Sequence, residues 1–452
     1  MIYIVNIFFS LLSLILVFNA PIEYSYTFCL LINVFFVIQN VLYFGLRKNK
    51  NLVGFQFLFM IAFYFTNFVY PVFYYPYNPH FSLFEYTFNE KIISYATAVA
   101  FMAYSFYMLG LLFMEKKWEE ETFSLKPIDF EKFSKFFFRL TIVSFFLYLA
   151  TGGHSALASE YSGGGDLIEK GISSYIYILF YVAIILLTIF IFKVQNNKNR
   201  IFYLFIACAL MLFFVFLGSR TLPLALGVTL LVSYNNNQKK IPNVVFLSLI
   251  GFGALFLTFI MFARTVSFTD QAYLQSGLQR FEINSAWDLG MDLIINNRNL
   301  YTLIDFSNES SNTFGLTMLG GILSPIPFLQ SFVCRFFEIP PDLIGSATFN
   351  TYLDFGAGST FGLGTNVVSD VYLAFGVIGV VSFFLFFGWI VGKAEYYSKS
   401  NVYWNVVYFM FVSNSIFLCR SGYFDNLRPL IWALVITYLY NLRQSIKNKN
   451  TV

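Results

Sequence analysis

Charged residues are scarce in this chain, and their scarcity excludes an ordinary soluble fold. Only 12% of the 452 residues are charged, whereas 58% are hydrophobic. Soluble domains carry roughly 25% charged residues. A chain of this composition cannot cover its surface with polar groups, so a bilayer must act as its solvent.

Residues that bind metals are also few. The sequence holds two histidines and four cysteines, and none are spaced like the ligands of a zinc site or a disulfide framework. No Asp-x-Asp occurs, so the metal–diphosphate clamp of nucleotide-sugar enzymes has no candidate. The stretch GAGSTFG at 356–362 lacks the spacing and the strand–helix context of a dinucleotide loop. We therefore expect no metal and no cofactor.

Long apolar runs are abundant instead. The first has no cleavage site and is expected to be a retained span rather than a signal peptide. These runs predict an all-α polytopic membrane protein with about twelve transmembrane helices. The predicted spans are 2–19, 24–46, 52–73, 92–114, 136–150, 173–192, 201–217, 221–234, 243–262, 370–392, 402–418 and 428–442.

The cations divide unevenly between alternate loops. One set of loops holds 19 of the 28 lysines and arginines, which predicts that this set and both termini are cytoplasmic. Lysine outnumbers arginine 15 to 4 in that set, whereas arginine outnumbers lysine 7 to 2 in the other. Because arginine presents a planar fork to oxyanions, the outer face is predicted to hold an anionic ligand. The alternative is that the arginines pair with acids such as Glu282 or Asp292.

The predicted spans divide the chain into three regions. Residues 1–262 hold helices 1–9, residues 263–369 form a large outer loop, and residues 370–452 hold helices 10–12 and a cytoplasmic tail. The loop begins with QRFEINSAWDLGMDLII, whose pattern is typical of an interfacial amphipathic helix. The uncharged stretch 310–334 is interrupted by prolines and a glycine pair, so we expect a re-entrant or surface-packed segment rather than a thirteenth span.

The predicted sidedness limits the chemistry. ATP and nucleotide cofactors would lie on the wrong side of the membrane, so a reaction on the outer face must draw its energy from the substrate. A sugar carried on a polyprenyl pyrophosphate already has a good leaving group. The protein would then have to hold the pyrophosphate, stabilise its growing charge and accept a proton from the attacking hydroxyl.

Four stretches resemble the bacterial O-antigen polymerases, the Wzy-type oligosaccharide repeat unit polymerases. They are GSR around Arg220, FGLTMLGGILSPIP, the run FGLGTNVVSDVYLAFGVIGVVSFFLFFGWIVG at 361–392, and CRSGYFDNLRP. Relatives often carry an arginine directly after the second proline, whereas Phe328 follows Pro327 here. Whether Arg335 takes that role is left open.

The resemblance implies a C-type glycosyltransferase architecture, with many helices around an outer-face cavity that opens laterally to lipid. It implies a metal-independent glycosyltransferase that moves a growing glycan from undecaprenyl pyrophosphate onto an incoming lipid-linked repeat unit, in O-antigen or a related surface polysaccharide. It also implies membrane lipid and a chain-length regulating co-polymerase of the Wzz type as partners. The expected location is the bacterial inner membrane.

Under this interpretation, outer-face arginines hold pyrophosphate or glycan. Arg220 lies at a hairpin tip where a pyrophosphate headgroup would sit, and the alternative is that it snorkels to lipid phosphate. An ion pair between Asp425 and Arg428 is a competing explanation for the last loop. The five candidates are Arg220, Arg264, Arg280, Arg420 and Arg428.

Asp370 is the first candidate for the base. It is predicted to begin the helix 370–392 with Ser369 as its cap, and a helix N-terminal acid favoured by the dipole alone is the alternative. Lesser candidates for the base are Glu282, Asp354 and His154. The residues predicted to contact sugar hydroxyls are Tyr372 and Asn366.

Two other functions remain open at this point. A lipid-linked oligosaccharide flippase also has about twelve spans, but its charges lie within the spans at mid-membrane. An O-antigen ligase shares the large late loop, usually with a histidine in it. Residues 263–369 contain no histidine, which makes the ligase less favoured.

Overall fold

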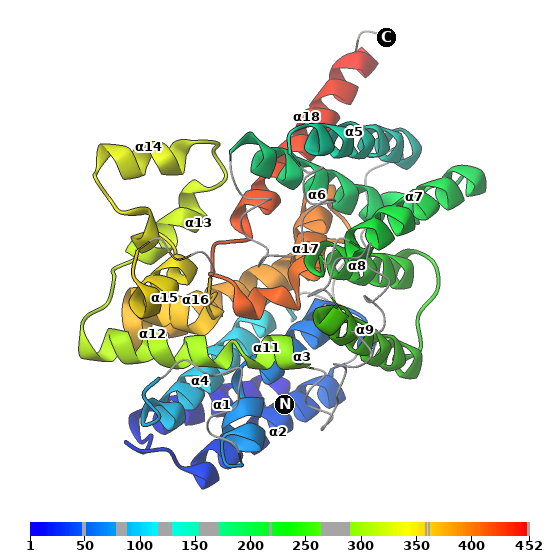
Figure 1. Cartoon of the computed structure of the whole chain (residues 1–452). Helices are drawn as coiled ribbons and strands as arrows, with labels where there is room; N and C mark the ends of the chain where they lie inside the picture. The colour runs from blue at the N-terminus through cyan, green and yellow to red at the C-terminus, as the bar shows by residue number, and fades with distance from the viewer. Residues whose placement is uncertain are drawn as a thin grey trace.

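Helices and their connections make up the part of the chain that the structure, a computed structural model, describes (Figure 1). This part comprises residues 1–47, 51–77, 88–115, 129–152, 171–216, 219–263, 290–357, 359 and 362–449. No strand occurs among these residues. The predicted all-α class is therefore confirmed for the described chain.

A helix overlaps each of the twelve predicted spans. Six described helices are long and apolar enough to cross a membrane: α2 (Tyr26–Leu46), α4 (Ile92–Glu115), α5 (Phe130–Ala150), α6 (Ile172–Ile191), α7 (Asn197–Phe216) and α16 (Val367–Tyr397). The other six are α1 (Ile2–Phe18), α3 (Phe55–Asn67), α8 (Thr221–Asn237), α9 (Asn243–Ala263), α17 (Val402–Asn414) and α18 (Leu427–Lys449). The structure thus supports a polytopic membrane protein, and the count of twelve spans stays a prediction.

Two predicted boundaries were wrong for local reasons. Helix α5 begins six residues before the predicted span, because the Asp129 side chain accepts a hydrogen bond from the Lys132 backbone N–H and caps the helix. Helix α3 ends at Asn67, well short of the predicted end of its span, and a π-helical turn containing Pro71 (η1, Tyr70–Tyr74) follows. Neither change of boundary removes the apolar run from which the membrane span was predicted.

The centre of the bundle is the pair α4 and α16, which pack more extensively than any other two helices in the described chain (Figure 1). Glycines set this packing. A Cβ at Gly110 would collide with the backbone of Leu385, and one at Gly388 would collide with the carbonyl oxygen of Tyr107. Small residues at these points let two helix backbones approach closely, as membrane helices commonly do.

Replacing Gly388 by alanine is expected to reduce stability by about 1–3 kcal/mol or more, because the added methyl overpacks the contact between α4 and α16. Gly227→Ala in α8 is the matched control, since a Cβ there meets nothing within 4 Å. That change should be neutral or stabilising by roughly 0.5–1 kcal/mol. Thermal unfolding of both purified variants in one detergent tests the pair, and equal unfolding temperatures would contradict the packing argument.

The described part of the large loop folds over one end of the α4–α16 pair. It forms α11 (Met291–Ile294), α12 (Asn297–Glu309), η6 (Leu316–Met318), α13 (Leu319–Leu323), α14 (Leu329–Phe336), η7 (Pro341–Leu343) and α15 (Ser346–Phe355). Helix α12 contacts both α4 and α16 (Figure 1). The stretch 310–334 is therefore broken into short helices rather than one long helix. Its re-entrant position stays a prediction, and most of the predicted amphipathic helix lies outside the described residues.

Connections that alternate along the chain meet at two separate ends of the bundle. At one end, the side chains of Asn51 and Asn235 are hydrogen-bonded at 3.0 Å. At the other, Asn297 donates to the carbonyl oxygen of Thr66 at 2.8 Å. Each of these two contacts joins segments that the charge bias predicts to lie on the same side. The assignment of the lysine-rich end to the cytoplasm remains a prediction.

Candidate functional site

Two arginines from different hairpins converge on one carboxylate. Arg220 Nη2 lies 3.2 Å from Asp292 Oδ1. Arg420 Nη1 lies 2.5 Å from Asp292 Oδ2 and donates to the Asp292 carbonyl oxygen at 3.1 Å. We call Arg220, Asp292 and Arg420 the arginine cradle. Its three members come from segments that are far apart in the sequence.

Turns and close packing place these side chains. Arg220 is the N-cap residue of α8, and Arg420 ends the 3-10 turn η8 (Phe417–Arg420), with its guanidinium 5.8 Å from the Phe417 ring centre. Asp292 lies in α11, two residues after the N-cap residue Gly290. A Cβ at Gly290 would overlap the ring of Phe65 in α3. The absence of a side chain at this glycine therefore lets α11 pack closely against α3.

The arginine cradle is half-buried rather than enclosed. The side chain of Arg220 is 13% exposed, and those of Asp292 and Arg420 are 29% and 30% exposed. The alternative to the predicted anion site, that outer-face arginines pair with acids such as Asp292, therefore holds for these two in the structure. Two guanidinium groups share a single carboxylate, so these three side chains carry a formal charge of +1. Partial burial strengthens their attraction for an anion relative to bulk water.

The loop that follows Arg420 is held by Asp370. The Oδ2 atom of this residue accepts a 2.7 Å hydrogen bond from the backbone N–H of Tyr423. The side chain is buried, and its Oδ1 atom has no hydrogen-bond partner among the described residues. Buried carboxylate oxygens are normally satisfied. The unpartnered oxygen is thus an acceptor next to the segment that carries Arg420.

The helix that carries Asp370 begins earlier than predicted. Its N-cap is Asn366, whose Oδ1 accepts from the Val368 N–H at 2.9 Å, and the helical residues start at Val367. Ser369 therefore lies inside the first turn and is not the cap. The sequence prediction was wrong because it began the membrane span at Asp370, whereas Val367 and Val368 already belong to the helix.

A break in α16 separates its first segment from the remainder. Gly376 has φ 62° and ψ −154°, a conformation that is essentially restricted to glycine. The carbonyl oxygen of Leu373, just before the break, accepts hydrogen bonds from the backbone N–H of Thr313 at 2.8 Å and from its hydroxyl at 3.3 Å. A discontinuous helix of this kind places a helix start deep in a membrane protein without leaving backbone groups unsatisfied.

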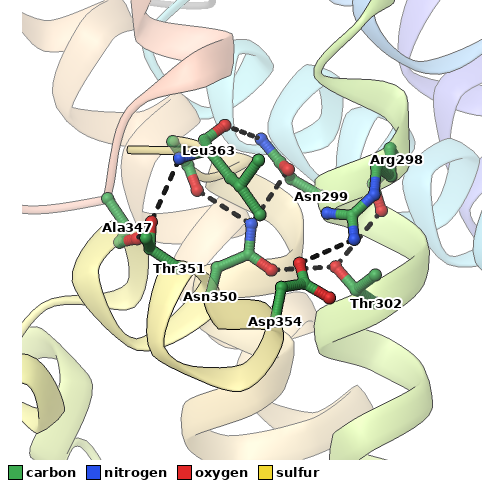
Figure 2. Close-up of polar contacts among 9 residues, drawn as sticks. Arg298, Asn299, Thr302, Ala347, Asn350, Thr351, Asp354 and Leu363 are labelled. Atoms are coloured by element: carbon green, nitrogen blue, oxygen red, sulfur yellow. Dashed lines mark hydrogen bonds and ion pairs between the residues drawn. The ribbon is translucent and has the colours of Figure 1, made fainter. Parts of the chain in front are cut away.

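An amide network holds the loop that precedes α16 (Figure 2). Asn299 donates to the carbonyl oxygen of Leu363 at 2.9 Å, and Asn350 donates to that of Gly364 at 3.0 Å. An ion pair at 2.6 Å between the buried Arg298 and the more exposed Asp354 lies beside this network (Figure 2). Helices α12 and α15 thereby hold Leu363 and Gly364 in place. The carboxylate of Asp354, a lesser candidate for the base, is taken up by that ion pair.

Arg428 lies in an aromatic setting at the start of α18. Its Nε donates to the carbonyl oxygen of Ser324 at 2.8 Å, and its guanidinium lies 5.5 Å from the ring centre of Tyr175. No ion pair within 4 Å joins it to Asp425 in the described part of the chain. Asp425 instead accepts from the Gly422 N–H at 2.6 Å and closes a turn.

The remaining predicted residues are either buried or outside the described chain. Asn366 is fully buried, and its amide donates to the Asn67 side chain at 2.9 Å. The Tyr372 hydroxyl is within hydrogen-bond distance of Asn308 at 2.7 Å and of the Tyr95 hydroxyl at 2.8 Å. Four candidates lie outside the described residues: His154, Arg264, Arg280 and Glu282.

Comparison with known families identifies the chain. The family described as O-antigen polysaccharide polymerase Wzy matches residues 1–450. The chain belongs to this family. No curated protein and no solved structure matches it.

Membership of the Wzy family fixes the general function. The protein is a multi-pass membrane protein of polysaccharide biosynthesis that polymerises O-antigen repeat units, and its substrate is a lipid-linked oligosaccharide. The predicted resemblance is confirmed over the whole length of the chain. Within the described residues, no group of three or more His, Cys, Asp or Glu side chains is arranged to bind a metal ion.

Sequence reasoning named Asp292 only as an acid with which an arginine could pair. Its place between Arg220 and Arg420 follows from the packing of three helix ends, and the Arg420 contact spans 128 positions of the chain. The only local signal was an acid two residues after a glycine, and that pattern is too common to identify a site.

Proposed function

We propose that the arginine cradle of this Wzy polymerase binds the pyrophosphate of an undecaprenyl-linked oligosaccharide on the extracytoplasmic face. The glycan would then pass to an incoming lipid-linked repeat unit. The observation that carries the proposal is the convergence of Arg220 and Arg420 on a single half-buried carboxylate. Because these two guanidinium groups already bind an anionic group of the protein, they are arranged to bind the anionic group of a substrate.

Asp292 shows where that anion would bind. Each of its two carboxylate oxygens forms an ion pair with one guanidinium group, as two oxygens of a pyrophosphate would. A pyrophosphate carries more negative charge than a carboxylate, so it would displace Asp292 from the two arginines. Each charge-assisted hydrogen bond gained in this way contributes about 1.5–3 kcal/mol.

In the proposed reaction, the acceptor hydroxyl attacks the anomeric carbon of the donor sugar. The bond between that carbon and the pyrophosphate oxygen breaks, and the departing pyrophosphate takes the bonding electrons. Arg220 and Arg420 stabilise the growing negative charge, as preorganised donors do in other group transfers. The acceptor proton passes to Oδ1 of Asp370, which lacks a hydrogen-bond partner in the described chain and adjoins the Arg420 loop through Tyr423.

Cationic side chains would make a metal ion unnecessary in this scheme. Arg428 follows the last loop at the start of α18, and we propose that it makes a further contact with phosphate or glycan. Other proposed contacts are Arg264 and Arg280 for phosphate, Tyr372 and Asn366 for sugar, and Glu282 and His154 as alternative bases. We also propose an inner-membrane location with both termini cytoplasmic, and a chain-length regulating co-polymerase as partner.

The proposed function is tested by reconstitution of the purified protein with its lipid-linked repeat unit. A ladder of lengthening lipid-linked products, with release of undecaprenyl pyrophosphate, is expected without added metal and in the presence of a chelator. A deletion strain should cap its surface lipid with single repeats. Loss of all repeats would instead indicate a ligase or a flippase, and lipid-linked repeats trapped inside the cell would indicate the flippase.

Removal of the internal anion should strengthen substrate binding. The Asp292→Asn variant is expected to bind a short-chain polyprenyl pyrophosphate about tenfold more tightly, because no carboxylate competes for the two arginines. Asp305→Asn is the control, since the partner of Asp305 is Asn89 rather than an arginine. Direct binding to both variants in detergent measures the effect. Weaker binding by the Asp292 variant would contradict the competition.

A further inference from the structure

A polar cavity of about 400 Å³ lies at the end of the bundle opposite the arginine cradle. It is lined by the connections α2–α3, α8–α9 and α16–α17 and by the residues that follow α6. Helix α8 separates the two sites: Arg220 caps one end, whereas Asn235 near the other end lines the cavity. A helix of 17 residues is about 25 Å long. The cavity is therefore too distant to take part in the proposed transfer.

The one acid among the described lining residues is already neutralised. Glu395 Oε1 accepts from Arg47 Nη2 at 2.8 Å, and its other oxygen accepts from the Gln56 amide. Arg47 also donates to Gln56 Oε1 at 2.5 Å. Arg47, Gln56 and Glu395 thus form a closed network with no net charge in one wall of the cavity.

Three lysines in the lining have no such compensation. Lys193, Lys240 and Lys399 form no ion pair with a carboxylate in the part of the chain that the structure describes. The ammonium group of Lys193 lies 5.1 Å from the ring centre of Phe130 and is partly buried, and this burial lowers its pKa to about 8. An uncompensated cation in a partly desolvated site is stabilised by a bound anion. The described lining of the cavity therefore has the charge of an anion site.

A buried hydrogen-bond acceptor in the cavity lining adds a second requirement for the ligand. The Asn405 amide nitrogen donates to the carbonyl oxygen of Ser398 at 2.9 Å, but its Oδ1 atom is buried without a hydrogen-bond partner among the described residues. Asn405 is only 6% exposed and lines the cavity. A ligand that satisfied this oxygen would need a hydrogen-bond donor, such as a hydroxyl group, close to its anionic group.

Hydrogen bonds between two connections hold the rim of the cavity in place before a ligand binds. Asn235 Oδ1 accepts from the Asn51 amide at 3.0 Å and from the Ile241 N–H at 2.9 Å. The Leu52 N–H donates to Asn243 Oδ1 at 3.1 Å. These contacts join the α2–α3 and α8–α9 connections. A rim held in this way lowers the conformational cost of binding a ligand.

We propose that this cavity is a binding site for a hydroxyl-bearing phosphate ester, with Lys193, Lys240 and Lys399 around the phosphate and Asn405 accepting from the hydroxyl. Its volume lies within the range of small-ligand sites. The same chemistry occurs in the headgroup of phosphatidylglycerol and in soluble polyol phosphates. The site is separate from the proposed catalytic site and does not depend on the reaction assigned there.

The test uses the full-length protein in nanodiscs. One arm compares phosphatidylcholine discs with and without phosphatidylglycerol, and native mass spectrometry counts the retained lipid. The other arm titrates glycerol 3-phosphate against protein in phosphatidylcholine discs by calorimetry. Saturable binding in the first arm identifies a lipid headgroup, and saturable binding in the second identifies a soluble ester. Absence of binding in both arms overturns the proposal.

Two triple variants distinguish a built site from general attraction to a basic surface. Lys193→Gln/Lys240→Gln/Lys399→Gln should weaken binding by about tenfold or more. The control Lys135→Gln/Lys198→Gln/Lys239→Gln removes three exposed lysines at the same end that do not line the cavity, and it should bind like the parent protein. Equal weakening in both would overturn the proposal.

The hydroxyl contact is tested by a separate variant of a buried residue. An exposed lysine provides a second variant in case the first does not fold. Asn405→Leu should remove the preference for glycerol 3-phosphate over inorganic phosphate while leaving phosphate binding intact. If the buried change prevents folding, the single variant Lys240→Gln still tests the site, because Lys240 is exposed. Retention of the full preference in Asn405→Leu, or unchanged binding in Lys240→Gln, would contradict the assigned contacts. Polymerisation by these variants should be unchanged in phosphatidylcholine, which separates this proposal from the proposed function.

Discussion

Replacing Arg220 or Arg420 by alanine is expected to reduce the rate of polymerisation by about 10²–10³-fold, the usual effect of removing one preorganised donor from a developing oxyanion. Cells carrying either variant should display single repeats instead of long chains. The in vitro ladder of lipid-linked products measures the loss directly. Lys91→Ala is the matched control, because Lys91 is an exposed cation at the same end of the bundle and has no ion pair in the described chain.

A structural role for the arginine must be separated from a role in binding pyrophosphate. Removing Arg220 also removes an ion pair to Asp292, and an acid left without its full set of partners lowers stability. The double variant Arg220→Ala/Asp292→Ala removes both partners together. If Arg220 only held Asp292, this variant would recover the full wild-type rate. The proposal requires the rate to stay well below that of the wild type, because only the Arg420 guanidinium group is left for the pyrophosphate. Unfolding temperatures of the three variants show how much of any loss is structural.

The second large effect is expected at Asp370. Asp370→Asn should lower the turnover number by about 10²–10⁴-fold, the contribution of a general base, with little change in KM. Asparagine keeps an oxygen that accepts from the Tyr423 N–H, so the loop that carries Arg420 should stay in place. Turnover and KM measured on the lipid-linked acceptor separate a base from a residue that only positions the loop.

The control for this change is Asp425→Asn. Asp425 also accepts from a backbone N–H, that of Gly422, and lies in the same loop. Its loss should alter turnover by no more than a few-fold. Wild-type turnover in Asp370→Asn would show that Asp370 acts only by holding Tyr423, and the base would then have to be sought among other acids of this face.

Hydropathy predicted the helices because it depends on composition over about twenty residues and not on neighbours in space. A helix accordingly overlaps each predicted span. Their ends were less predictable, since Asp129 caps α5 and Asn366 caps α16 through single side-chain hydrogen bonds. The break at Gly376 was also invisible, because glycine within an apolar run is compatible with both a straight and a broken helix.

The candidate site was predicted in part. Arginine enrichment on one face indicated an anion site, and Arg220 and Arg420 do lie together. Nothing in the sequence indicated that they share Asp292 or that Arg428 lies apart over Tyr175. The distribution of lysine and arginine among the loops predicts on which face a cation lies. It does not predict which cations come into contact on that face.

The sequence by itself determined that this chain is a membrane protein and to which family it belongs, because both depend on composition or on residues adjacent along the chain. Only the tertiary structure decided which polar groups meet: Asp292 between two arginines, Asp370 against the Tyr423 backbone, and three lysines around a cavity at the far end that pair with no carboxylate among the described residues. The physical reason is that ion pairs and hydrogen bonds act over a few ångströms. Helix packing alone brings such distant segments within that range.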